Sequence, residues 1–327
     1  MSKKVFDFLS SFGVMILGVT LVFVCTISFS SASEKEYFKF PQAGPRNSNG
    51  MIDMDNSLPV SKPTEPIVKS DVSYAGVLTA FSAIAIDEQS DKILFEKNID
   101  QIRPLASITK LMSVLVLLDL PLDWSSVVTV TADDYDDNSH QIKIGEVYSF
   151  QDLWYAALVA SSNGSIKSLV NHSGLSEENF VGKMNIKAQE MNLSSMHFTD
   201  PVGLDSGNVG NARDTAELLR QALKFEKIKK ALNTDSYVLR PQNSNEERII
   251  YSTDLLLSNW IPNDFAKENI FGKTGYISDS RYNFAVNLKD KNKNSIIVVI
   301  LGAETEALRF EEARDLAEWV FEEWMWE

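Results

Sequence analysis

Cysteine and histidine are scarce in this chain, whose 327 residues include one Cys and three His. A single thiol excludes a disulfide framework and any zinc site built from several thiolates. The histidines, His140, His172 and His197, lie in local settings that form no metal-ligand spacing. We therefore expect no metal ion and no other cofactor, and the composition does not favour a Ser-His-Asp relay.

Basic residues are also few relative to acidic ones. The chain carries 31 Lys and Arg against 45 Asp and Glu, a formal net charge of −14. Such a surface repels a phosphate polyanion, so nucleic acid is not expected as a partner. The hydrophobic fraction of 44% and the charged fraction of 23% are ordinary for a globular protein and exclude bulk disorder.

The first 33 residues have the pattern of a targeting segment. Lys3 and Lys4 precede an uncharged, mostly apolar stretch at 12–29, and small residues follow at 30–33. This length lies between a signal-peptide core and a membrane span, so residues 1–33 are predicted to be a signal peptide or an N-terminal membrane anchor. Cys25 follows Val24 rather than the small residue of a lipoprotein cleavage site, so it is predicted to be a buried apolar side chain. Either interpretation puts the rest of the chain outside the cytoplasm.

Residues 34–75 lack any hydrophobic period and contain five prolines. Such a composition cannot bury enough apolar surface to offset the entropy of ordering, so it predicts a disordered linker. Residues 76–327 remain, and this length suffices for one substantial core.

The remaining region predicts an α+β fold. Strands are expected at 79–86 and 92–97 as a hairpin, followed by an apolar helix at 104–120. Helices are expected at 150–160, 177–192 and 212–225, strands at 270–277, 282–288 and 295–301, and a last helix at 304–327. Strands at both ends of the region predict an antiparallel sheet built from both chain ends, with helices packed on it and a helical subdomain in the middle.

A possible nucleophile lies in the first turns of the apolar helix. Ser107 and Lys110 are three residues apart, which places their side chains on one helix face. The positive end of the helix stabilises a developing alkoxide and disfavours an ammonium, so an uncharged Lys110 could act as a base. Chance produces such pairs, and the pattern is weak alone.

Two further motifs strengthen the pattern. Ser161 and Asn163 form a Ser-x-Asn sequence after the predicted helix at 150–160. Lys273, Thr274 and Gly275 begin inside a predicted strand, where glycine would let a substrate backbone lie close alongside and the lysine would supply a positive charge. The order Ser-x-x-Lys, Ser-x-Asn, Lys-Thr-Gly, on a helix, a loop and a strand, is a strong signal.

At these motifs the sequence resembles the low-molecular-mass penicillin-binding proteins, specifically the serine D-alanyl-D-alanine carboxypeptidases. The resemblance extends to the opening hairpin, to the segment 198–205 and to the Ala-Arg-Asp sequence at 212–214. It therefore covers residues 79–322 and implies the β-lactamase/transpeptidase-like fold.

The resemblance implies a role for each motif residue. Ser107 would attack the D-Ala-D-Ala peptide bond and Lys110 would accept its proton. Ser161 would relay a proton to the leaving amine, and Asn163 would orient Lys110 and the substrate amide.

The same resemblance assigns the binding residues. Lys273 and Thr274 would face the terminal carboxylate of the substrate, and Arg309 matches an arginine that holds this carboxylate. The alternative interpretation makes Arg309 a solvated residue at the start of the last helix. The backbone N–H groups of Ser107 and Tyr276 would form the oxyanion hole.

Two positions depart from the family pattern. Asn163 is followed by Gly164 and Ser165 where the family has Asp-Ala, and Arg281 precedes Tyr282 where the family favours small residues. These departures concern substrate preference rather than acylation.

The sequence thus predicts a D,D-carboxypeptidase that removes the terminal D-alanine of peptidoglycan stem peptides and is inhibited covalently by β-lactams. A D,D-endopeptidase that cleaves cross-links is the first alternative. A β-lactamase ranks lower, because no Glu in 164–272 has Asn four residues later. An inactive wall-binding protein of the same fold is disfavoured by the presence of all three motifs.

We expect a monomer outside the cytoplasm, tethered to the cytoplasmic membrane by its N-terminal segment. The acidic residues near the C-terminus, Glu322, Glu323 and Glu327, argue against an anchor there.

Overall fold

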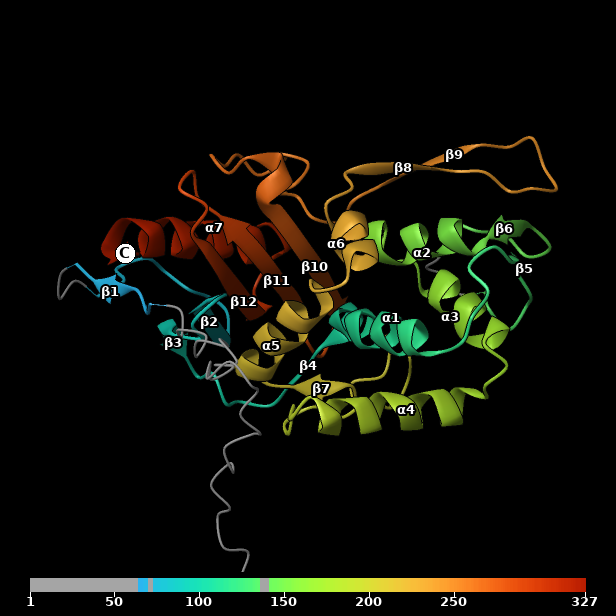
Figure 1. The fold of residues 1–327 in the computed structure, drawn as a ribbon, viewed down its shortest axis with the longest axis horizontal. Coiled ribbons are helices and arrows are strands. Elements are labelled where there is room, and N and C mark those ends of the chain that lie inside the picture. Colours follow the sequence, from blue (N-terminus) through green and yellow to red (C-terminus); the bar gives the residue numbers. More distant parts are fainter. Residues whose placement is uncertain (1–63, 70–72, 136–140) are drawn as a thin grey trace, which may run out of the picture. The chain divides into compact units, whose positions relative to one another are not determined.

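The computed structural model describes residues 64–69, 73–135 and 141–327 (Figure 1). The predicted N-terminal segment, Cys25 and most of the predicted linker lie outside the described residues. Within the described ranges, no helix has both the length and the hydrophobicity required to cross a membrane.

A five-stranded antiparallel sheet forms the framework, as the sequence predicts. Its strand order is β10 (Ile270–Ile277), β11 (Arg281–Lys289), β12 (Ser295–Ala303), β2 (Ser82–Asp87) and β3 (Ile93–Lys97). Strands from both ends of the region therefore pair in one sheet, through β12 and β2.

Both faces of the sheet are covered because β12 is apolar at almost every position. Ile296 and Val298 belong to the core shared with Phe310 of α7 (Glu306–Glu323), whereas Ile297 and Val299 belong to the core on the other face. Alternate side chains of a strand point to opposite faces, so a continuous apolar run predicts this double coverage. The second face carries α1 (Lys110–Asp119) and α5 (Ala212–Ala222) (Figure 1).

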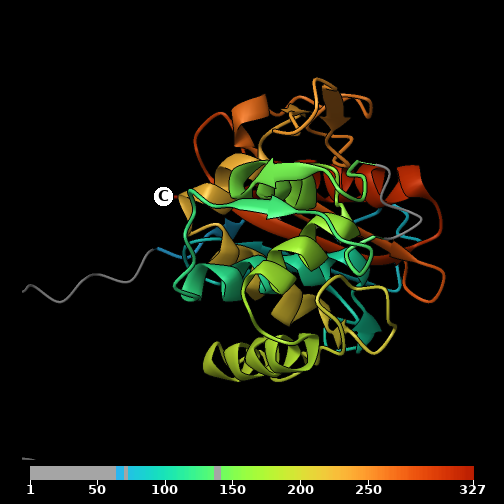
Figure 2. The same cartoon turned by 90° about the vertical axis from the view of Figure 1, so that its right-hand side faces the viewer.

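A helical region lies beside the sheet and faces the viewer in Figure 2. It contains α2 (Phe150–Val159), α3 (Asn163–His172), α4 (Glu177–Glu190) and α6 (Glu226–Leu232), with the small strand pair β5 (Val127–Thr129) and β6 (Val147–Ser149). A hairpin of β8 (Ser236–Leu239) and β9 (Arg248–Tyr251) extends along its edge. Helix α1 is buried along its first eight residues, which explains its lack of polar periodicity.

The apolar helix begins later than predicted. Pro104 lies in β4 (Arg103–Pro104), which pairs with β7 (Val209–Gly210), and a 3₁₀ turn η1 (Ala106–Thr109) leads into α1. Proline is compatible with both a short edge strand and a first helical turn, so its presence did not distinguish them.

The two ends of the described chain also differ from the prediction. Helix α7 ends at Glu323, and β13 (Trp324–Met325) pairs with β1 (Ile67–Val68) inside the predicted linker. Lys69 reinforces this pairing, because its backbone N–H donates to the Glu323 carbonyl at 2.7 Å. The last part of the segment 34–75 therefore contains a strand and is not a disordered linker throughout. The sequence did not predict this strand, because its partner is distant in the chain and local periodicity does not report such pairing.

Candidate active site

Lys110 is fully buried at the start of α1, directly after the 3₁₀ turn that carries Ser107. Its Nζ lies 2.7 Å from Ser107 Oγ, 2.6 Å from Asn163 Oδ1 and 2.7 Å from the Val202 carbonyl oxygen. The amine is thus fixed against the half-buried serine hydroxyl by groups from α3 and from the loop before β7. The spacing of the Ser-x-x-Lys motif produces the predicted contact.

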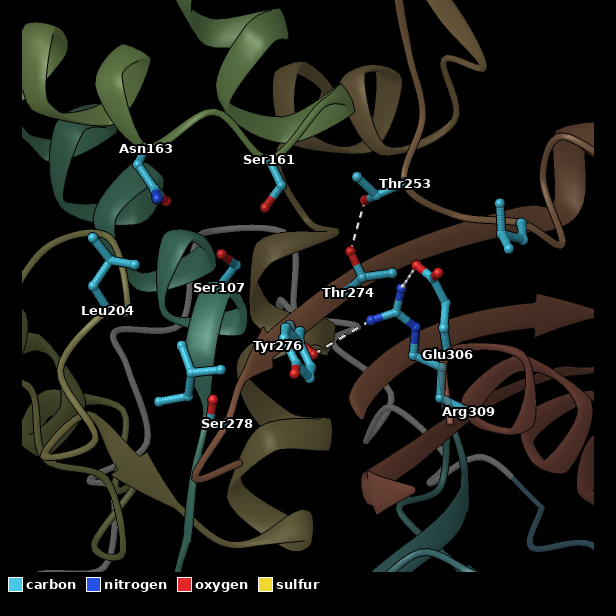
Figure 3. A pocket seen from close by; sticks show the side chains of 14 residues that line it. Ser107, Ser161, Asn163, Leu204, Thr253, Thr274, Tyr276, Ser278, Glu306 and Arg309 are labelled. Carbon is cyan, nitrogen blue, oxygen red and sulfur yellow. Dashed lines mark hydrogen bonds and ion pairs between the residues drawn. The ribbon is translucent and has the colours of Figure 1, made fainter. Parts of the chain in front are cut away.

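The turn between α2 and α3 delivers the second motif. Ser161 adopts a left-handed backbone with φ of 57°, and Asn163 is the first residue of α3. Ser162 caps this helix, since its hydroxyl accepts from the Ser165 N–H at 3.2 Å. A sharp turn followed at once by a capped helix aims Ser161 and Asn163 into the same cleft (Figure 3).

Lys273 brings the third motif to this turn. Its buried Nζ on β10 donates to Ser161 Oγ at 2.8 Å and to the Thr274 carbonyl at 2.9 Å. Burial, followed by the nearby charges of Lys110 and Arg309, holds the pKa of Lys273 well below its ordinary value, while Asp254 opposes this shift. Two buried amines therefore face one cleft from its opposite walls.

Gly275 is required by the packing of the protein itself. A Cβ atom there would lie 2.6 Å from the Leu105 carbonyl oxygen and 3.2 Å from the Ala106 Cβ. The glycine lets the segment before Ser107 pack directly on β10. This packing is a reason for the residue that the sequence did not reveal, and the close approach of a substrate backbone stays a prediction.

Asn283 on β11 binds the segment before Ser107 through hydrogen bonds. Its buried side chain donates to the carbonyls of Pro104 at 2.9 Å and Leu105 at 3.2 Å, and accepts from the Gly302 N–H at 2.9 Å. The nucleophile segment is therefore hydrogen-bonded to the sheet as well as packed on it.

The three motifs line one cleft of about 560 Å³ (Figure 3). Thr274 Oγ1 is 2.7 Å from Thr253 Oγ1, and half-exposed Tyr276 stacks on Tyr282 with ring centres 4.4 Å apart. The lining residues are Ser107, Ser161, Asn163, Gly203, Leu204, Thr253, Leu255, Thr274, Gly275, Tyr276, Ile277, Ser278, Glu306 and Arg309.

Arg309 is buried beside this cleft and is not a solvated residue. It donates to the Gly275 carbonyl at 3.4 Å and pairs with Glu306 at 3.0 Å, as the dashed lines in Figure 3 mark. Burial lowers its pKa to about 10, against the opposing effects of Glu306, Asp254 and Tyr282. The guanidinium thus adds a positive charge near the Lys-Thr-Gly strand.

Sequence reasoning missed a buried carboxyl group under this strand. Asp254 is buried, and its Oδ1 accepts from the N–H groups of Leu256 at 2.9 Å and Leu257 at 3.2 Å. Burial raises the pKa of Asp254 to about 6, although the two hydrogen bonds and the charges of Arg309 and Lys273 favour ionisation. No local signal marks this aspartate, because only the fold brings it to the cleft.

The loop that supplies the Val202 carbonyl is held by Asp200. Asp200 Oδ1 accepts from the N–H groups of Val202 and Gly203, both at 2.6 Å. Gly203 has φ of 88°, and a Cβ there would lie 2.0 Å from the Ala106 carbonyl oxygen. The segment 198–205, noted only through its resemblance, is therefore a wall of the site. Among the described residues, no cluster of three or more His, Cys, Asp or Glu is arranged to hold a metal ion.

Comparison with known proteins gives consistent matches over this region. The profile of the D-alanyl-D-alanine carboxypeptidase family, peptidase family S11, matches residues 69–305. The chain is 25% identical over 270 residues to a D-alanyl-D-alanine endopeptidase of Pseudomonas aeruginosa, with 81% of this chain and 84% of that protein covered. It is 28% identical over 252 residues to D-alanyl-D-alanine carboxypeptidase DacF of Bacillus subtilis, covering 75% of this chain and 63% of that protein.

A solved structure shares the fold. The Streptomyces K15 DD-transpeptidase superposes with a TM-score of 0.68 at 20% sequence identity, covering 76% of this chain and 100% of that one. At this identity the likeness establishes the fold alone, and the predicted transpeptidase-like fold is confirmed.

Proposed function

The chain belongs to the D-alanyl-D-alanine carboxypeptidase family, and from this premise we propose that it removes the terminal D-alanine of peptidoglycan stem peptides through an acyl-enzyme. The observation that carries the proposal is the buried Lys110 amine held 2.7 Å from Ser107 Oγ. An amine and a hydroxyl at hydrogen-bond distance, with the amine fixed by other groups, form an activated nucleophile.

In the proposed acylation, Ser107 Oγ attacks the carbonyl carbon of the scissile bond while its proton passes to Lys110. An uncharged amine has two N–H groups, which can donate to Asn163 Oδ1 and the Val202 carbonyl. Its lone pair then faces the Ser107 hydroxyl, which is the geometry a general base requires. Collapse of the tetrahedral intermediate breaks the C–N bond, and the leaving amine of D-alanine takes a proton.

Ser161 is proposed to deliver that proton. Its hydroxyl accepts from Lys273 at 2.8 Å and lines the cleft that Ser107 also lines. Ser161 gives its hydroxyl proton to the leaving nitrogen, and the proton that Lys110 took from Ser107 replaces it, so Lys110 is uncharged again before water attacks. Water then attacks the ester carbonyl, releases the shortened peptide and restores Ser107.

The cationic wall of the cleft is proposed to bind the terminal carboxylate of the substrate. Arg309 and Thr274 line the cleft with a guanidinium and a hydroxyl, and the Lys273 amine contacts Ser161, which also lines it. The oxyanion is proposed to lie between the backbone N–H groups of Ser107 and Tyr276, where preorganised donors stabilise developing charge. An analogous positioning of a β-lactam carboxylate accounts for the expected covalent inhibition.

Endopeptidase action on cross-links remains the alternative, and a specific finding favours keeping it. The Pseudomonas relative is named an endopeptidase, and this chain covers 84% of its length. The two reactions share the acylation step and differ only in the leaving amine.

The family acts on the cell wall, so this enzyme works outside the cytoplasm. We further propose that residues 1–33 export the chain and remain as its tether, that 34–63 and adjoining residues act as a spacer, and that the catalytic domain is a monomer. The charge pattern of residues 1–33 supports the first part of this proposal.

The deciding experiment incubates the protein with a pentapeptide ending in D-Ala-D-Ala and measures free D-alanine. Release is expected for the wild type and not for Ser107→Ala. Ser107→Ala should also fail to form an adduct with a fluorescent penicillin, while Ser244→Ala, on the exposed tip between β8 and β9, should label normally. Cleavage of cross-linked muropeptides without D-alanine release would instead identify the endopeptidase. A Ser107→Ala variant that labels like the wild type would refute the nucleophile.

A further inference from the structure

Two arginines share one aromatic ring, and one of them, Arg281, begins β11 directly after the turn from β10. The guanidinium carbon of Arg103 lies 4.1 Å from the centre of the Phe81 ring, and that of Arg281 lies 4.8 Å from it. No carboxylate of the described residues forms an ion pair with either guanidinium, and Arg103 Nε is buried without a hydrogen-bond partner. In a chain with an excess of acidic residues, two adjacent cations without a counter-charge indicate a binding site for an anionic group of another molecule.

The like charges are held together by structure. Arg281 has a left-handed backbone with φ of 56°, and the fully buried Ser280 Oγ lies 2.7 Å from its carbonyl oxygen and accepts from the Ile277 N–H at 3.0 Å. This turn directs the Arg281 side chain onto Phe81. Burial, and then the charge of Arg281, lowers the pKa of Arg103 from its ordinary value.

The register of the sheet places this pair at one end of the cleft. Arg281 on β11 is directly opposite Ile277 on β10, so the two side chains share a face of the sheet. Ile277, the last residue of β10, and Ser278 line the cleft, and Lys273 lies four residues before Ile277 in the same strand. Arg103 directly precedes Pro104, whose carbonyl is bonded to Asn283 beneath the nucleophile segment.

The distance along β10 from Thr274 to Ile277 indicates which residue of a bound peptide lies nearest to Arg103 and Arg281. Strand β10 is an edge strand of the sheet, and an extended peptide beside it advances about 3.3 Å per residue. With its terminal carboxylate near Thr274, as proposed above, the third residue from the peptide's end falls opposite Tyr276 and Ile277. A long side chain at that residue extends toward the two guanidiniums.

Resting on the proposed function, we propose that Arg103 and Arg281 bind a carboxylate on the side chain of the stem-peptide residue that precedes D-Ala-D-Ala. A guanidinium stacked on an aromatic ring keeps its N–H edges free for a carboxylate. Two such groups together favour a peptide with an anionic third residue over one with a neutral or basic third residue. The arginine pair thus determines substrate specificity on the acyl side of the scissile bond.

The test uses two peptides that end in D-Ala-D-Ala and differ only at the preceding side chain, a carboxylate in one and the corresponding carboxamide in the other. Each is assayed with the full chain for kcat/KM of D-alanine release and as a competitor of fluorescent penicillin labelling. We expect the wild type to prefer the carboxylate peptide roughly five- to tenfold in both assays, and less at high salt because Arg281 is exposed.

Three variants test whether the preference for the carboxylate peptide depends on Arg281. Arg281→Asn removes the charge but tolerates the left-handed backbone, and it should bring the ratio of the two peptides close to one. Arg281→Lys should retain part of the ratio, because the charge remains without the planar fork. Arg240→Gln, which removes an equal charge from the exposed tip between β8 and β9, should keep the wild-type ratio.

The two assays separate the two proposals. If no D-alanine is released but the carboxylate peptide still competes better and Arg281→Asn abolishes the difference, the carboxypeptidase function is refuted and the arginine site stands. Equal competition by the two peptides on the wild type, or a preference that survives in Arg281→Asn, overturns the arginine site whatever the hydrolysis result.

Discussion

Lys110 Nζ and Asn163 Oδ1 lie 2.6 Å apart, although 53 residues separate them in the sequence. The contact joins the helix that starts beside the nucleophile to the turn that delivers Ser161. It therefore couples the geometry of two motifs, and displacement of either one alters the position of the amine at Ser107.

Replacing the amine tests its role directly. Lys110→Arg keeps a positive charge but cannot lose its proton near neutral pH, so the rate of penicillin acylation should fall about 10²- to 10⁴-fold. Stopped-flow labelling with a fluorescent penicillin measures this rate.

Arginine is larger than lysine, and the site is buried, so a folding control is needed. Lys110→Met has a similar length without the amine and should lose acylation to the same extent, while circular dichroism reports whether each variant is folded. Lys224→Arg, in the exposed turn that follows α5, should acylate at the wild-type rate. Acylation retained in a folded Lys110→Met variant would exclude the amine as the base.

A pair of glycines provides a matched test of packing. A Cβ at Gly275 meets the Leu105 carbonyl oxygen at 2.6 Å, whereas a Cβ at Gly182 on α4 meets nothing within 4 Å. Gly275→Ala should displace the segment before Ser107, lower the free energy of unfolding by about 1–3 kcal/mol and slow acylation. Gly182→Ala should raise the free energy of unfolding by about 0.5–1 kcal/mol, because alanine favours a helix over glycine.

Urea unfolding monitored by circular dichroism, together with labelling rates, measures both effects. Equal changes in the free energy of unfolding for the two substitutions would mean that the segment before Ser107 does not pack tightly on β10 at Gly275.

The buried carboxyl of Asp254 predicts a pH-dependent stability. Its pKa is raised to about 6 in the folded protein, from about 3.8 in the unfolded chain. The folded state therefore binds more protons than the unfolded state between these values, and stability should fall as pH rises from about 4 to about 6. The loss above pH 6 is on the order of 3 kcal/mol for this group.

Asp254→Asn removes this titration. The difference in free energy of unfolding between the variant and the wild type should shift in favour of the variant as pH rises from 4 to 7. Denaturant unfolding at several pH values measures this difference. A difference that stays constant over this range would contradict a raised pKa.

The parts of the fold that the sequence predicted are those with strong local patterns. The continuous apolar run of β12 and the polar turn at 88–91 between β2 and β3 identify their strands within a few residues. Helix α3 was not predicted, because it begins inside the Ser-x-Asn motif and is rich in polar residues that usually indicate a loop. The hairpin β8–β9 was also missed, since Arg248 of β9 pairs with Glu146, just before β6, and a local pattern does not show a contact between distant residues.

The residues of the candidate site also fall into two groups, those that a sequence motif identifies and those that only the fold brings together. The three motifs carry residue types whose chemistry is evident from their spacing, so Ser107, Lys110 and Lys273 could be named before the fold was known. Asp254 and the Val202 carbonyl could not, because one is a single acid without a motif and the other is a backbone oxygen. Their roles arise only from tertiary contacts.

The pairing of β1 with β13 has a practical consequence for anyone who shortens this protein. A version that starts at residue 76, where the composition changes, would leave Trp324 and Met325 with unpaired backbone groups at an open sheet edge. It would also lose Tyr74, whose ring meets Phe95 and Trp319 at 5.5 Å each. Such a fragment should self-associate through the opened edge, whereas one that starts upstream of Ile67 keeps the edge closed and should stay dispersed in solution.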